Sequence, residues 1–187
     1  MKKADSFMIN RITRIEEFRS RFFHGSREGS WNMDECKKYL QQADEFLTLI
    51  AVLIHLSSGQ PARTPEFLGM TYRNTHSGVR NLFIYKNTIA IRTEHSKASG
   101  NTNQPVETIY RFAPPRLAKV IIQYITYIRP FTDAIERLAL GNTSRSDFLF
   151  NNPYNPAKPW PGSKLTKALQ QGKLYSKTPD IQSTNHQ

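Results

Sequence analysis

Cysteine is almost absent from this chain, since Cys36 is the single one among 187 residues and an internal disulfide is therefore excluded. Long apolar runs are absent as well, because the longest, Phe46 to Leu56, is interrupted by Thr48 and His55. A membrane-spanning helix needs about 20 apolar residues, so we expect no membrane partner. The first five residues lack the apolar core of a secretory signal. We expect a protein of a reducing compartment, nuclear in a eukaryote and otherwise cytoplasmic.

Acidic residues are scarce, with 15 Asp and Glu against 26 Lys and Arg, which gives a net charge of +11. The excess is concentrated in residues 60–130, which hold 10 basic and 3 acidic side chains, whereas residues 1–59 hold 9 and 8. A localised basic segment is the electrostatic signature of a nucleic-acid-binding protein. No group of residues has the spacing of a metal site, so we expect no metal.

The length and the 38% hydrophobic content suit one domain of ordinary size. We divide the chain into an N-terminal helix and linker (1–30), a core (31–172) and a polar tail (173–187) that we expect to be disordered. The predicted helices cover residues 8–23, a stretch from Asn32 or Asp34 to about 57, a short stretch from Pro65, residues 116–140 with a kink at Pro130, and a last helix capped by Ser163. The predicted strands are 81–86, 88–93 and 106–112, followed by a short extended segment at 148–150 and a loop at 151–161. This order predicts an α+β fold that is mostly helical, with a small three-stranded antiparallel sheet.

One arginine stands between a chain break and a new helix, in the segment Gly59-Gln60-Pro61-Ala62-Arg63-Thr64-Pro65-Glu66. Its guanidinium can meet two phosphate oxygens with parallel N–H bonds, which a lysine cannot do. The competing interpretation is a surface arginine that pairs with Glu66 one helical turn away. Further along, a polar hairpin carries Lys97, which is either functional or an ordinary solvated turn lysine.

The Gly59–Glu66 box, followed by the strand meander, the long helix and Phe-Leu-Phe at 148–150, resembles the catalytic core of tyrosine recombinases of the phage-integrase type. It is most similar to the recombinase segments of Crypton elements and of fungal RecQ-like telomere-linked helicase proteins, over roughly residues 33–170. The resemblance implies DNA strand transfer through a 3′-phosphotyrosine link, with no cofactor or metal, by a homo-oligomer assembled on DNA. It assigns Arg63 to the phosphate grip and Lys97 to the general acid that protonates the leaving 5′ oxygen.

The rest of that machinery is missing from the sequence. No arginine follows Arg145, so the family's His-x-x-Arg box cannot be completed, and Tyr154 and Tyr175 lack the setting of its nucleophile. Without the second arginine, transition-state charge would be poorly neutralised, at a cost of several kcal/mol. We therefore expect an integrase-type core with its C-terminal part missing, a truncated or decayed DNA-binding fragment that is inactive as it stands. The alternative is a non-enzymatic interaction or scaffold relic of a mobile-element or helicase gene.

Duplex DNA is the expected partner, bound through its phosphates rather than its bases. The expected contacts are Arg63, Arg73, Arg80, Arg92, His95, Lys97, Lys158 and Lys164. Six aromatic residues are candidates for base stacking, although their spacing favours packing in the core. They are Tyr72, Tyr85, Tyr110, Tyr124, Tyr127 and Trp160, with Trp160 beside Lys158 the best of them.

Overall fold

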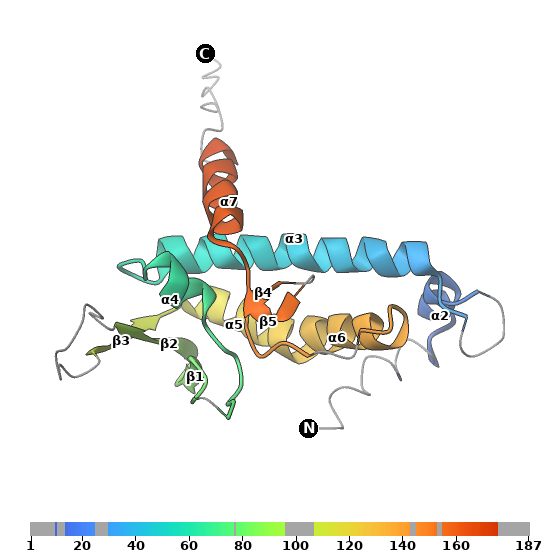
Figure 1. The fold of residues 1–187 in the computed structure, drawn as a ribbon, viewed down its shortest axis with the longest axis horizontal. Coiled ribbons are helices and arrows are strands. Elements are labelled where there is room, and N and C mark those ends of the chain that lie inside the picture. The colour runs from blue at the N-terminus through green and yellow to red at the C-terminus, as the bar shows by residue number, and fades with distance from the viewer. Residues whose placement is uncertain are drawn as a thin grey trace, which may run out of the picture.

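The computed structural model describes residues 10, 14–24, 30–76, 78–95, 107–142, 145–152 and 155–175 (Figure 1). The helical elements are α2 (Glu16–Phe22), α3 (Met33–Ser57), α4 (Thr64–Leu68), α5 (Pro115–Gln123), the π-helical turn η1 (Tyr124–Ile128), α6 (Arg129–Leu138) and α7 (Gly162–Tyr175). The strands are β1 (Leu82–Tyr85), β2 (Thr88–His95), β3 (Glu107–Phe112), β4 (Asn151–Asn152) and β5 (Asn155–Pro159). The predicted α+β class with a small three-stranded antiparallel sheet is confirmed. No helix in the described stretches combines the length and the apolar character needed to cross a membrane.

The long helix α3 runs along the whole molecule, with the sheet near one end and α2 near the other (Figure 1). It begins where the sequence predicts, because the Asn32 side chain accepts a hydrogen bond from the Glu35 backbone N–H at 3.3 Å. Acidic Asp34 and Glu35 in its first turn favour the positive end of the helix dipole. The helix ends at Ser57, and Gly59 then takes a φ of +91°, which a glycine adopts without strain.

The three strands form a meander in the order β1-β2-β3, antiparallel throughout. A two-residue turn joins β1 to β2, and its Lys86 has a φ of +51°. Since side chains alternate along a strand, Leu82, Ile89 and Ile91 face the helices and are at most 7% exposed. The sheet is thus apolar on its inner face, as its alternating sequence predicts.

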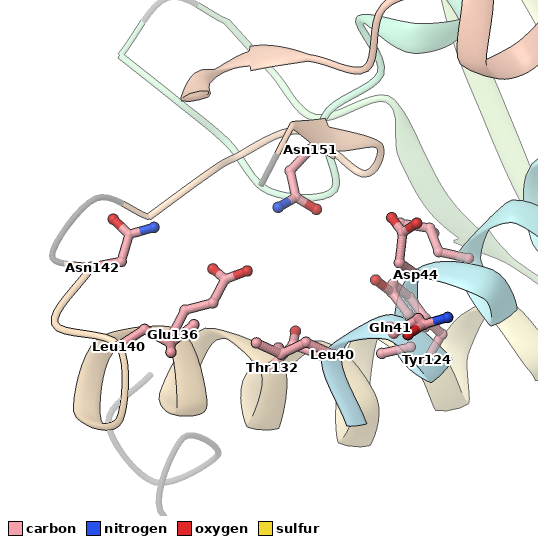
Figure 2. A pocket seen from close by; sticks show the side chains of 11 residues that line it. Leu40, Gln41, Asp44, Tyr124, Thr132, Glu136, Leu140, Asn142 and Asn151 are labelled. Carbon is pink, nitrogen blue, oxygen red and sulfur yellow. The ribbon is translucent and has the colours of Figure 1, made fainter. Parts of the chain in front are cut away.

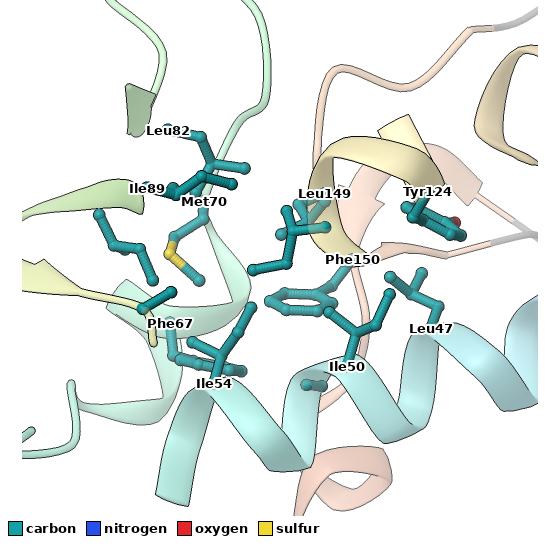
Figure 3. Close-up of a cluster of buried hydrophobic side chains, with 14 of the residues drawn as sticks. Leu47, Ile50, Ile54, Phe67, Met70, Leu82, Ile89, Tyr124, Leu149 and Phe150 are labelled. Carbon is teal, nitrogen blue, oxygen red and sulfur yellow. The ribbon is translucent and has the colours of Figure 1, made fainter. Parts of the chain in front are cut away.

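The main core lies where α3, α4, α5 and α7 meet this inner face (Figure 3). Ile50 of α3 is 1% exposed, and the rings of Phe67 and Phe150 stack with their centroids 5.0 Å apart. Each such side chain contributes about 1.5–3 kcal/mol on burial. The Phe-Leu-Phe segment therefore supplies core packing, with Leu149 and Phe150 fully buried.

A second, smaller cluster joins α2 to the other end of α3 and to α6. The ring of Phe22 packs edge-on against Phe131 at 5.4 Å and against Tyr39 at 5.9 Å. Burial raises the pKa of the Tyr39 hydroxyl to about 12. Cys36 lies in the same cluster, so the lone thiol is a packing residue here.

The predicted helix 116–140 is continuous but changes its winding. An α-helical Pro130 would lack its hydrogen bond and its ring would crowd the carbonyl of Thr126. The chain answers with the π turn η1 immediately before α6, in place of the predicted kink.

Three other local predictions need correction. Residues 151–161 are not a plain loop, because β4 and β5 pair as an antiparallel hairpin with Asn151 opposite Pro159. Ser163 is not the cap of the last helix, since α7 already begins at Gly162. The first predicted helix is helical over Glu16–Phe22, and Ile15 before it is extended.

Candidate functional site

Arg63 stands at the surface, at the first position of α4. Its backbone is extended, with φ −60° and ψ 147°, and its carbonyl accepts the first hydrogen bond of the helix from Phe67 at 2.8 Å. Ala62 before it and Phe67 after it are buried, so the backbone is anchored on both sides while the guanidinium is exposed. In the part of the chain that the structure describes, Arg63 makes no ion pair, and the predicted pairing with Glu66 is not among its contacts.

Arg111, which the sequence did not single out, fixes the loop that carries Arg63. It lies on the inner face of β3 and donates from Nε to the carbonyl of Gln60 at 2.5 Å. A second hydrogen bond runs to the hydroxyl of Thr93 on β2, which is 2% exposed. The loop is thereby held against the sheet. The available signal was a cation at an inward position of an alternating strand.

Two of the expected DNA contacts, Arg80 and Arg92, come together at the start of β1. The backbone N–H of Arg92 donates to the carbonyl of Asn81 at 2.7 Å, and Arg80 Nε donates to the carbonyl of Leu82 at 3.0 Å. Arg92 also forms an ion pair with Glu94. Since Arg92 and the inward Thr93 are adjacent on β2, Arg92 faces away from the side of the sheet that Arg111 binds.

Two other expected contacts are engaged inside the protein. Arg73 forms an ion pair with Asp147 and donates to the carbonyl of Ser146 at 2.7 Å. Lys164 reaches both carboxylate oxygens of Asp44, at 2.5 and 2.6 Å, and lies over the Trp160 ring with Nζ 3.9 Å from the centroid. Both cations bridge segments distant in sequence, so we assign them a role in holding the fold.

The remaining candidates lie apart from these. Lys158 is exposed on β5, and His95 is the last residue of β2. Lys97 and Tyr154 lie outside the described residues, and Tyr175 is the last residue of α7.

The stacking candidates divide between the interior and the surface. Trp160 and Tyr124 are 2% and 3% exposed, so neither can receive a base, and the preference for Trp160 is wrong. Tyr85 and Tyr110 are 51% and 56% exposed, so for these two the expectation of core packing is wrong.

A buried arginine that the sequence did not mark, Arg129, ties α6 to the Phe-Leu-Phe segment. It is 2% exposed, donates to Asp133 at 2.8 Å and reaches the carbonyls of Ser146, Phe148 and Leu149 at 3.3 Å. Burial alone would lower its pKa, but the Asp133 carboxylate raises it above the ordinary value. Arg129 is therefore always charged and acts as a structural clamp.

A pocket of about 570 Å³ opens between α3, α6 and β4. Figure 2 shows the Glu136 carboxylate directed into it, toward Asn151, with Asp44 on the far side. Burial, followed by the charge of Asp133, raises the pKa of Glu136 above its ordinary value. The described residues contain no group of three or more side chains suited to hold a metal ion.

No protein-family model matches the chain, and no solved structure matches it. The resemblance to tyrosine recombinases is therefore carried by the Gly59–Glu66 box and the order of elements alone.

Proposed function

We propose that this protein binds duplex DNA through its phosphates, as a fragment of a tyrosine-recombinase-like core, and does not transfer strands. The observation that carries the proposal is the exposed Arg63 guanidinium, held on an anchored loop that Arg111 fastens to the sheet. An arginine preorganised in this way can grip a phosphate without first leaving a carboxylate.

The surrounding charge supports the same ligand. Residues 60–130 carry 10 basic and 3 acidic side chains, and the exposed Arg63, Arg80 and Lys86 are among the former. Binding through phosphates releases counterions, so affinity should fall steeply with salt and depend little on base sequence.

The test is the binding of a fluorescently labelled 20-base-pair duplex, followed by anisotropy over a series of salt concentrations. Arg63→Ala should weaken binding by roughly 1–3 kcal/mol and reduce the salt slope by about one unit, and Arg63→Lys should recover part of the loss. Arg137→Ala, which removes an exposed arginine from the last turn of α6, is the matched control. Duplex affinity that is absent at low salt would overturn the proposal and favour the scaffold alternative.

Catalysis is tested separately with a nicked suicide substrate and a denaturing gel. We expect no covalent protein–DNA adduct, because the chain offers a phosphate grip without the family's second arginine and nucleophile setting. An adduct that disappears in Tyr154→Phe or Tyr175→Phe would show that the chain is an active recombinase.

A further inference from the structure

The outer face of the three-stranded sheet carries aromatic side chains at positions where a solvated sheet face usually carries polar ones. Strand register places Phe83, Ala90 and Phe112 in one row across the sheet and sets Tyr110 opposite Arg92 in the next. Alternation puts this whole set on the side opposite the buried core positions. The small Ala90 leaves a shallow floor in the central strand.

Three of these rings are open to solvent. Tyr85, Tyr110 and Phe112 are 51%, 56% and 50% exposed. The rings of Tyr85 and Phe112 lie 5.8 Å apart at an interplanar angle of 54°, so they meet without covering each other's faces. Rings that the core neither buries nor needs are available to a ligand.

Cations border the rings. The Arg80 guanidinium lies 5.1 Å from the Phe83 centroid, and Lys86 Nζ lies 5.5 Å from that of Tyr85. Arg92 is the direct cross-strand neighbour of Tyr110. Among the described residues of this face, Glu94 is the one acidic side chain, and it pairs with Arg92, which leaves the face positive.

We propose that this outer face is a stacking platform for the unpaired bases of a single-stranded nucleic acid. A nucleotide is the ligand that offers both partners at once, a π face for the rings and a phosphate for the cations between them. A small sheet that stacks two or three bases on exposed aromatics is an established physical solution for single strands. The inference goes beyond the duplex grip at Arg63 and does not depend on it.

Other ligands satisfy the face less well. An acidic peptide would meet the cations but leave three half-exposed rings in water. An apolar protein surface would cover the rings, but it would desolvate Arg80 and Lys86 without supplying counter-charges. The combination of rings and cations therefore favours a nucleic acid strand.

The test is anisotropy with labelled 12-mers of deoxythymidine and of uridine, which separates DNA from RNA as the source of the bases. The double variant Tyr110→Leu, Phe112→Leu keeps apolar side chains on the strand but removes the rings, and should weaken single-strand binding about tenfold or more. Tyr110→Phe keeps a ring and should bind as the parent does. Tyr127→Leu removes a 45% exposed tyrosine of η1, outside this face, and is the matched control.

A second measurement locates the strand directly. A 12-mer carrying 5-iodouracil should photo-crosslink to peptides that contain Tyr85, Tyr110 or Phe112. Crosslinks confined to other segments would overturn the proposal, as would unchanged single-strand affinity in a leucine double variant that keeps its far-ultraviolet circular dichroism. A parent that dimerises at micromolar concentration, with the double variant monomeric and equal to it in single-strand affinity, would reassign the face to self-association.

Failure of this inference and failure of the duplex proposal are distinguishable. The leucine double variant should leave duplex affinity nearly unchanged, whereas Arg63→Ala should weaken duplex binding and spare the single strand. A loss of both affinities to the same extent in either variant would contradict the assignment of two separate surfaces.

Discussion

Basic side chains are used differently in the helical body and around the sheet. In the body they sit in ion pairs, such as Arg21 with Glu35 at 2.7 Å and Arg129 with Asp133 at 2.8 Å. Around the sheet, Arg63, Arg80 and Lys86 make no ion pair with any described residue. Total charge is therefore a poor guide to binding, because the pairing of each cation decides whether it is available to a phosphate.

The largest expected effect comes from breaking the most buried pair. Arg129→Met should lower the free energy of unfolding by about 3–5 kcal/mol, because it leaves Asp133 and the carbonyls of Ser146, Phe148 and Leu149 without their donor. Urea unfolding measures it. Arg137→Met, an exposed change on the same helix, should stay within about 0.5 kcal/mol of the parent. A loss below 1 kcal/mol for Arg129→Met would show that the clamp is dispensable.

A smaller effect should separate structural lysines from binding ones. Lys164→Met should lower stability by up to about 1 kcal/mol, since its pair with Asp44 is partly exposed, and should leave duplex affinity unchanged. Unfolding and anisotropy on the same preparation test both halves. If Lys164→Met weakened duplex binding as much as Arg63→Ala, the division between paired and available cations would fail.

The smallest effect concerns Glu136, a carboxylate of the helical body for which the described residues supply no side-chain partner. Its folded pKa is raised above the unfolded value of 4.5, so the folded state holds the proton more tightly and loses stability as pH rises through that window. Glu136→Gln should therefore be more stable than the parent near pH 7, and the difference should vanish toward about pH 4. Urea unfolding across this range measures it. A variant less stable at pH 7 would show that the carboxylate has a favourable partner.

Local chemistry made much of the fold predictable. The Asn32 cap, the alternation of β1 and β2 and the exposed Arg63 at the start of α4 all follow from residues close together in sequence. The three-stranded sheet and the central helix could be predicted for the same reason.

What could not be predicted depends on tertiary partners. Lys164 and Asp44 are 120 residues apart, and Arg73 and Asp147 are 74 apart, so no local pattern reveals that these cations are paired. Arg111 and Gln60 likewise meet only because the inner face of β3 packs against the loop after α3. The exposed rings of the sheet were misjudged because an alternating strand does not declare which face the helices will cover.

The π turn at Tyr124–Ile128 has a further consequence for how this sequence encodes its two cores. One extra residue per turn advances the angular phase of everything after it by about 100°. Ile121 before the turn and Ile135 after it therefore point to different clusters, although one unbroken rod carries both. The hydrophobic pattern is written in two reading phases, and the π turn is the punctuation between them.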